Sequence, residues 1–157
     1  MSVDRKDMVA FQAAIEAARN DVPEFMDKCA IGEGVYARDQ ARKICTDDKI
    51  VNNGDYRRNF KSGSKALRAG QSYKIDVYNN LDYAKHLEYG FRGHFVPGHW
   101  EGKSFVYQRN DPAGGMYVKF HRGHFTLRRA IKRTKDSQEA RLRYKQEQFF
   151  NDHGLGK

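Results

Sequence analysis

The histidines of this sequence are its first candidates for chemistry, because imidazole side chains bind metal ions and transfer protons. His94 and His99 lie five residues apart, and His121 and His124 lie three apart. Neither pair has a nearby cysteine partner or the helical HExxH spacing that holds zinc. Glycines around the first pair also make that segment a poor rigid support for two ligands. We therefore expect these histidines to lie in loops or interfaces, with no metal and no cofactor.

Acid–base catalysis by His86 and Glu88 is a second possibility, with Asp82 close by in the sequence. Side chains two residues apart on a helix diverge by about 200°, which separates this pair. The sequence also contains no GxSxG nucleophile motif, no phosphate-binding GxxxxGK[ST] loop and no GxGxxG motif. We expect a protein that is not an enzyme, and a small hydrolase that uses His86, Glu88 and His94 is the least favoured interpretation.

Basic residues form the stronger signal, above all the stretch RRAIKRTK at 128–135. No zinc finger, RNP motif or helix-turn-helix pattern accompanies this stretch, so it predicts sequence-independent attraction to phosphates. A solvated helix face, or a surface that forms salt bridges with another subunit, explains it equally well. The residues that we expect to face a polyanion or an acidic partner are Arg57, Arg58, Arg128, Arg129, Lys132 and Arg133.

Composition predicts one folded domain over residues 1–157. The chain is 39% hydrophobic and contains ten Phe, nine Tyr and one Trp, so it can bury a core despite its 31% charged residues. The net charge is +9 and is concentrated toward the end, where residues 116–157 carry 11 basic and 4 acidic side chains. Such asymmetry is typical of a protein with one face near a polyanion.

The cellular compartment is indicated by the beginning of the chain and by its cysteines. The opening MSVDRKDMVAFQ has charges where a signal peptide needs an apolar run, and nowhere do 18 apolar residues follow one another. Cys29 and Cys45 fit two reduced thiols better than a disulfide framework. We expect the chain to remain in the cytoplasm and to have no membrane contact.

Residues 1–46 are predicted to be helical. An apolar stripe at helical spacing predicts a long helix with one face toward the core. Pro23 lies inside this pattern and predicts a kink or a restart, and Gly32 and Gly34 predict an interruption before a weaker helical stretch to about Cys45. The stripe consists of Met8, Phe11, Ile15, Ala18, Val22, Phe25, Met26 and Cys29.

Residues 54–121 are predicted to form a small antiparallel sheet. The Asn53-Gly54 pair ends a polar surface loop and indicates a turn. Alternating patterns predict four strands, and KSGSKALRAG at 61–70 reads as a hairpin connection or a mobile loop. The predicted strands are 56–61, 72–78, 103–108 and 116–121.

A short helix and an extended arm interrupt this sheet between residues 79 and 100. Leu81, Ala84 and Leu87 recur at helical spacing, which leaves Glu88 among the outward-facing residues, and Gly90 ends the helix. The glycines and Pro97 that follow predict a shaped loop without regular structure. Long arms of this kind make contacts more often than they perform chemistry.

Residues 125–150 are predicted to form the last helix. One face presents Leu127, Ile131, Gln138, Leu142 and Phe149, and the opposite half carries the basic cluster. The predicted fold class is therefore α+β, with a long N-terminal helix, a small antiparallel sheet with its short helix and arm, and a long C-terminal helix.

Two short motifs and this order of elements resemble the neck and tail-completion proteins of long-tailed bacteriophages and phage-tail-like particles. The motifs are NGDYRRNF at 53–60 and YAKHLEYG at 83–90, and the resemblance extends over roughly 50–150. The family commonly approaches its last helix soon after the second motif. This chain instead has added strands through residue 121, which changes the length and contacts of the arm.

The resemblance implies a structural virion protein without catalytic residues, which forms a ring, typically six-fold, between the tail tube protein and the head-side connector or adaptor. It also implies assembly in the host cytoplasm and contact with DNA in the lumen. The residues that we expect to contact neighbouring subunits are Tyr83, Leu87, Tyr89, Phe91, Phe95, Pro97 and Trp100. The alternative is a sequence-independent nucleic-acid-binding protein that uses its C-terminal basic helix.

Overall fold

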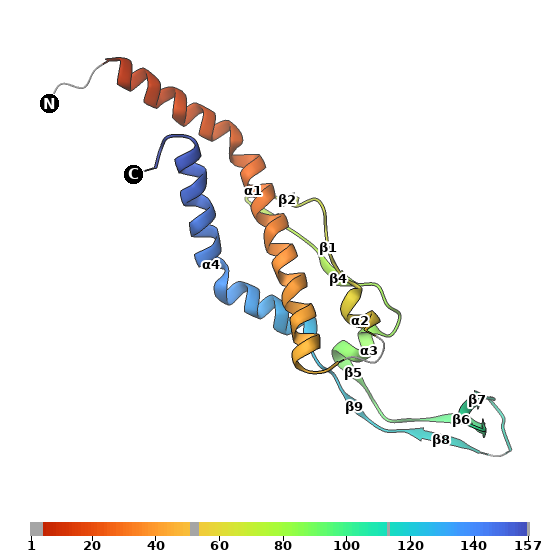
Figure 1. Cartoon of the computed structure of the whole chain (residues 1–157). Helices are drawn as coiled ribbons and strands as arrows, with labels where there is room; N and C mark the ends of the chain where they lie inside the picture. The colour runs from red at the N-terminus through yellow and green to blue at the C-terminus, as the bar shows by residue number, and fades with distance from the viewer. Residues whose placement is uncertain (1–4, 51–53, 113, 157) are drawn as a thin grey trace. The chain divides into compact units, whose positions relative to one another are not determined.

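The computed structural model describes residues 5–50, 54–112 and 114–156 and has the predicted α+β composition (Figure 1). Asn53, half of the predicted Asn-Gly turn, lies outside the described residues. The chain divides into two compact units. Unit 1 has the bounds Met1–Asn80 and Thr126–Lys157, and unit 2 has the bounds Leu81–Phe125. That residues 1–157 form a single domain stays a prediction.

The first helix of unit 1, α1 (Arg5–Asp47), is continuous through both predicted interruptions. The expected break at Gly32 and Gly34 is wrong. Their missing side chains instead allow close packing, because a Cβ at Gly34 would lie 2.7 Å from Ile75 Cγ1 and a Cβ at Gly32 would lie 2.6 Å from Lys145 Nζ. Tight packing of neighbours on the helix thus outweighs the low helix propensity of glycine.

The last helix, α4 (Thr126–Asp152), confirms the helix predicted at 125–150, and it packs antiparallel to α1. Contacts at both ends and in the middle of the pair establish this direction. Phe25 contacts Phe149 with ring centroids 4.5 Å apart, Glu33 binds Arg141, and Asp48 binds Arg129.

The packed face of α4 differs in part from the prediction. Thr126, Ala130 and Thr134 are buried, whereas Ile131 is exposed and does not belong to the packed face. The buried residues of α4 are therefore small ones, in the part of the helix that packs on α1 and pairs with it through Arg129 and Asp48.

The core of unit 1 lies around the C-terminal half of α1. Ala41, Ile44 and Cys45 are fully buried there, together with Phe60. The expectation that the whole N-terminal stripe faces the core is wrong, because its large residues before Phe25 are exposed. The stripe has the period of a packed face, but α4 covers only part of its length.

Four short strands lie in the described part of unit 1. The predicted strand at 56–61 is partly wrong, because α2 (Asp55–Arg58) is a helical turn in which Arg58 binds the Asp55 carboxylate at 2.6 Å. Burial of Tyr56 against Phe60 stabilises this turn. The strands form two antiparallel ribbons, in which β1 (Phe60–Ser62) pairs with β4 (Val77–Asn79) and β2 (Leu67–Ala69) pairs with β3 (Ser72–Lys74). The predicted single strand at 72–78 is thus two strands.

Unit 2 consists of a short helix and antiparallel strands. The helix α3 (Ala84–Tyr89) ends at Gly90, which has a φ of 77°, so the predicted helix and its stop are confirmed. The strands are β5 (Gly90–Phe91), β6 (His94–Glu101), β7 (Ser104–Tyr107), β8 (Gly115–Val118) and β9 (His121–Arg122).

The arm is the centre of a sheet rather than a loop, so the prediction of irregular structure is wrong. β6 pairs with β8 over His94–Pro97 and with β7 over Gly98–Glu101. Proline lacks an N–H for a strand ladder, yet Pro97 fits because it stands where the partner changes. Its carbonyl accepts a hydrogen bond from the Gln108 N–H at 3.2 Å, while the Gly98 N–H donates to the Gly114 carbonyl at 3.2 Å.

Candidate subunit interface and cationic surface

The ribbon formed by β6, β7 and β8 exposes large aromatic side chains. Phe95 and Tyr117 lie opposite each other across β6 and β8, and both are exposed. Trp100 lies opposite Phe105 across β6 and β7, with ring centroids 5.3 Å apart, and it is 60% exposed. Tyr107 at the end of β7 is also exposed. Aromatic side chains thus project from both paired halves of the ribbon.

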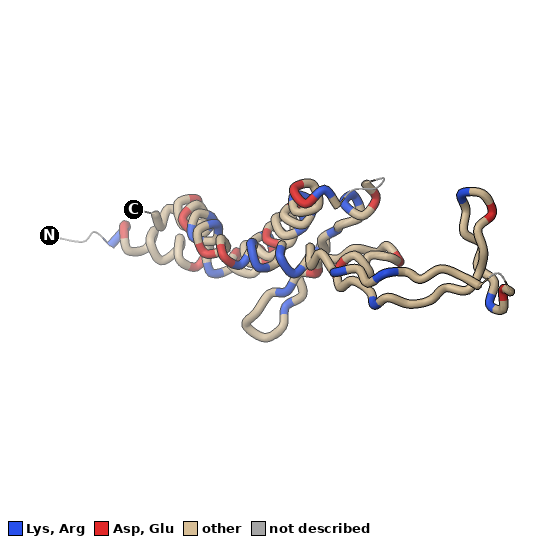
Figure 2. Tube along the Cα trace, turned by 90° about the horizontal axis from the view of Figure 1, so that it is seen from below, with Lys and Arg blue, Asp and Glu red and all other residues tan. Residues whose placement is uncertain are grey.

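Charge is nearly absent from the same strands. β6, β7 and β8 contain no lysine or arginine, and their one carboxylate is Glu101. Figure 2 shows this stretch of unit 2 almost without charged positions. Among the described residues of unit 2, Ala84 is the one buried apolar residue, so these aromatic rings do not form a core of their own. An exposed aromatic surface depleted of charge is typical of a protein–protein interface.

Backbone geometry and a histidine hold the ribbon in shape. Gly98 has a φ of 148°, and a Cβ there would lie 2.1 Å from the Val106 carbonyl oxygen, so only glycine permits this approach of β7. His99 contacts Asp111 through Nδ1 and Glu101 through Nε2 at 3.2 Å. The hydrogen bond with Asp111, followed by that with Glu101, raises the pKa of His99.

The short helix places the other predicted interface residues. Tyr83 and Tyr89 are exposed, and Leu87 is half-buried. Glu88 is buried, so its predicted outward position is wrong. Hydrogen bonds from the His124 N–H to the Leu87 carbonyl at 2.8 Å, and from the Phe125 N–H to the Glu88 carbonyl at 3.0 Å, join the end of this unit to α3.

The ring of Phe91 contacts histidines from separate parts of the sequence. This ring stacks on His121 with centroids 5.5 Å apart, and His86 and His94 approach it edge-on at 5.9 Å and 6.3 Å. These are ring contacts rather than a ligand set. Within the described ranges, no group of three or more His, Cys, Asp or Glu side chains is placed to hold a metal ion.

The predicted cationic residues occupy different environments. Arg129 forms an ion pair with Asp48, and Arg58 forms one with Asp55. Arg57 donates a hydrogen bond to Thr46 Oγ1 at 3.2 Å. Lys132 and Arg133 are exposed on α4, as is Arg128. Arg57, Arg58 and Arg129 thus have partners within unit 1, and Lys132 and Arg133 are exposed side chains of α4.

Two further basic residues lie beside two of the predicted cations, and the sequence interpretation did not include them. Arg42 and Lys43 on α1 join Arg57 and Arg58 on α2 around an open hollow of roughly 400 Å³. Arg42 also donates hydrogen bonds to the carbonyls of Arg58 and Phe60, at 3.3 Å and 2.9 Å. Arg42 and Lys43 are neighbours in the sequence, but only the fold shows that α2 lies beside them.

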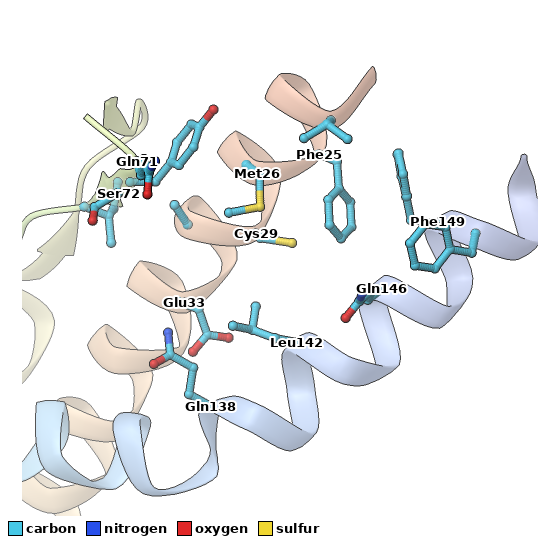
Figure 3. A pocket seen from close by; sticks show the side chains of 15 residues that line it. Phe25, Met26, Cys29, Glu33, Gln71, Ser72, Gln138, Leu142, Gln146 and Phe149 are labelled. Atoms are coloured by element: carbon cyan, nitrogen blue, oxygen red, sulfur yellow. The ribbon is translucent and has the colours of Figure 1, made fainter. Parts of the chain in front are cut away.

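An apolar groove lies along the pair of long helices and the β2–β3 ribbon (Figure 3). Its volume is about 620 Å³, and Phe25, Met26, Leu142 and Phe149 contribute to its lining. Cys29 also lines it, and burial raises the pKa of this thiol. A protonated, buried thiol agrees with a reduced cysteine that packs rather than reacts.

A comparison with models of protein families relates this chain to a known family. A family model described as "Bacteriophage HK97-gp10, putative tail-component" matches residues 10–90. This match begins within α1 and ends after α3, so it starts earlier than the resemblance at 50–150 and stops before the aromatic ribbon. No curated protein and no solved structure gives a significant match. None of the helices in the described part of the chain has the length and apolar content to cross a membrane.

Proposed function

This chain belongs to the HK97-gp10-like family of bacteriophage tail components, and from that premise we propose that it forms a ring at the neck of the virion. The ring completes the tail and joins the tail tube to the head-side connector or adaptor. A tail component is a structural part of the virion, so we propose no catalytic step. The same role fits a phage-tail-like particle.

The observation that carries the proposal is the aromatic ribbon of unit 2, which is nearly free of charged side chains. Phe95, Trp100, Tyr107 and Tyr117 are exposed on strands without a core beneath them. Burying one such side chain against another protein contributes about 1.5–3 kcal/mol. Several of them together supply the apolar centre that a subunit interface requires.

A ring follows if this ribbon binds a different surface on the next copy. Contacts between unlike surfaces are heterologous, and they close into a ring when the rotation between copies allows it. We propose six copies, with Tyr83, Leu87, Tyr89, Phe91, Phe95, Pro97 and Trp100 in or beside the contact. The exposed Lys132 and Arg133, with the hollow around Arg42, give such a ring a cationic surface for DNA in the lumen or for an acidic partner.

The test compares two tyrosines of similar exposure. Tyr117 on β8 is 66% exposed, and Tyr144 on α4 is 62% exposed. We expect Tyr117→Ala, alone and combined with Trp100→Ala, to lower the oligomer mass measured by mass photometry and to remove rings from negative-stain images. Tyr144→Ala is the control and keeps both. A wild-type chain that is monomeric at every concentration and missing from purified particles contradicts the proposal.

Sequence-independent nucleic-acid binding is the second candidate, and the basic hollow lined by Arg42, Lys43, Arg57 and Arg58 favours it. A fluorescence titration of duplex DNA at several salt concentrations separates the two functions. Tight, salt-dependent binding by a chain that forms no ring supports the second candidate. Ring formation with weak DNA binding supports the first.

A further inference from the structure

The face of α1 that packs on α4 follows a regular spacing. Phe25 contacts Phe149, Cys29 lines the groove between the two helices, and Arg141 lies 3.7 Å above the ring of Tyr36. Gly32 lies beside Lys145. Steps of four, three and four residues separate positions 25, 29, 32 and 36, which is the spacing of alternating a and d positions in a heptad.

The same spacing continues toward the N-terminus without a break. Alternating steps of three and four residues lead from Phe25 back to Met8, and each step ends at an apolar residue. We call this stretch the N-terminal seam. Its a and d positions are Met8, Phe11, Ile15, Ala18 and Val22.

No helix among the described residues covers the N-terminal seam from Met8 to Ile15, whereas Val22 lines the groove beside Phe149 of α4. The end of α4 reaches α1 at Asp21, where His153 Nε2 lies 3.0 Å from the carboxylate. Figure 1 shows α1 extending toward its N-terminus beyond the end of α4. Ala18 is buried, but the large seam residues are 43–57% exposed.

A helix of this kind needs a partner. The segment from Arg5 to Asn20 is the beginning of the 43-residue α1, so its helix is already nucleated, but its large apolar side chains stay in contact with water unless a partner buries them. A heptad seam of large apolar residues is matched by a second helix with the same pattern. This chain carries that pattern itself, and the seam continues an interface that already binds a helix.

We propose that the N-terminal seam pairs with the same segment of a second copy of this chain, parallel and in register. The flanking charges favour this direction. In a parallel pair the flanking positions place Asp7 beside Gln12 and Ala14 beside Arg19, without like charges. An antiparallel pair in which Met8 faces Ala18 and Phe11 faces Ile15 would bring Asp7 of one copy near Asp21 of the other, which is repulsive.

This contact goes beyond the proposed ring, because it uses α1 of unit 1 rather than the aromatic ribbon and requires only two copies. Variants of the ribbon and of the seam therefore separate the two associations. A ring that loses its ribbon contact retains seam-paired dimers, whereas a chain with a disrupted seam retains the ribbon contact.

The first experiment measures self-association of the full chain by sedimentation velocity across a hundredfold range of concentration. The variant Phe11→Glu/Ile15→Glu places two carboxylates in the seam. The matched control Ala13→Glu/Ala17→Glu places two carboxylates four residues apart on an exposed face outside the seam. We expect the seam variant to weaken association at least tenfold in Kd and the control to behave as the wild type. Equal behaviour of the two variants overturns the proposal.

The second experiment tests direction and does not depend on how well the first variant folds. Met8→Cys places a thiol near one end of the seam, and Ala13→Cys places one outside it. Under mild oxidation we expect a disulfide-linked dimer from Met8→Cys alone, because the same a position meets itself only in a parallel, in-register pair. Both native cysteines are buried, and the wild type measures their background. Failure of Met8→Cys to cross-link above the Ala13→Cys control overturns the parallel pair.

Discussion

Arg141 of α4 holds the carboxylate of Glu33 of α1 through two hydrogen bonds, from Nε at 3.0 Å and from Nη2 at 2.5 Å. The same guanidinium donates to Ser137 Oγ and to the Thr134 carbonyl, and it lies over the Tyr36 ring. Glu33 is buried, so its charge depends on this partner. The pair fixes the relative position of the long helices at the middle of their contact.

Removing Arg141 should therefore destabilise unit 1 strongly. Arg141→Ala leaves Glu33 as a buried charge without its guanidinium, at an expected cost of about 3 kcal/mol in the free energy of unfolding. Arg143→Ala is the control, because its pair with Glu139 is exposed and contributes at most about 0.5 kcal/mol. Urea unfolding followed by circular dichroism measures both. Similar midpoints for the two variants would show that the buried pair does not stabilise the fold.

The two glycines in α1 should respond oppositely to alanine. A Cβ at Gly32 meets the flexible end of Lys145, which can move, so Gly32→Ala should raise the unfolding free energy by up to about 1 kcal/mol through helix propensity. A Cβ at Gly34 meets the branched side chain of Ile75, so Gly34→Ala should lower the unfolding free energy by about 1–2 kcal/mol. Thermal unfolding of both variants measures the difference. If Gly34→Ala is the more stable variant, the packing of Ile75 on α1 is not as described.

His153 should make the α1–α4 contact depend on pH. The Phe149 carbonyl, 2.8 Å from Nδ1, raises the pKa of His153 most, followed by Asp21. A raised pKa in the folded state stabilises that state fully below the unfolded value of about 6.5, and this stabilisation is lost as pH rises through the folded pKa. The stability difference between wild type and His153→Ala should thus be larger near about pH 5.5 than near about pH 8.5.

Asp21→Asn provides the control for this pH dependence, because it removes one of the groups that raise the pKa of His153 and leaves the Phe149 carbonyl and Asp152 in place. We expect the pH dependence to shrink without disappearing. A stability difference that does not change with pH would mean that His153 does not titrate in contact with α1.

The cations of α4 should fall into two classes, one that contributes to DNA binding and one that contributes to the stability of the fold. Lys132→Ala/Arg133→Ala removes two exposed charges, so the slope of log K against log salt should become shallower by about 1.8 if both contact phosphates. Arg129→Ala instead removes a partner of Asp48, and its main effect should be a loss of up to about 1 kcal/mol in the unfolding free energy. An unchanged slope in the double variant would assign Lys132 and Arg133 to solvent or to a protein partner.

The long helices and the α3 stop could be predicted because their signals are local. The period of the apolar residues predicts α1 and α4, and Gly90 ends α3 as its sequence position suggests. The helix break predicted at Gly32 and Gly34 is wrong for the opposite reason. The packing at these glycines depends on Lys145 and Ile75, which are distant in the sequence. Helix propensity carries no information about such packing.

The candidate interface could be predicted only in part. The segment from Phe91 to Trp100 is recognisable as unusual, but its pairing with β7 and β8 depends on partners up to 24 residues away. The aromatic residues Tyr107 and Tyr117 join Trp100 and Phe95 on one ribbon only through that pairing. In the same way, Arg42 and Lys43 join Arg57 and Arg58 only because α2 returns to α1. Their roles in binding stay predictions.

The change of partner at Pro97 also limits how this ribbon can misassemble. The Pro97 carbonyl and the Gly98 N–H point to opposite sides, so each half of β6 has one paired side and one open edge. Each open edge is only four residues long, and a proline ends one of them. Natural proteins use such short, interrupted edges to prevent amyloid-like stacking of strands. The exposed aromatic surface of these strands is thereby protected from aggregation through strand pairing.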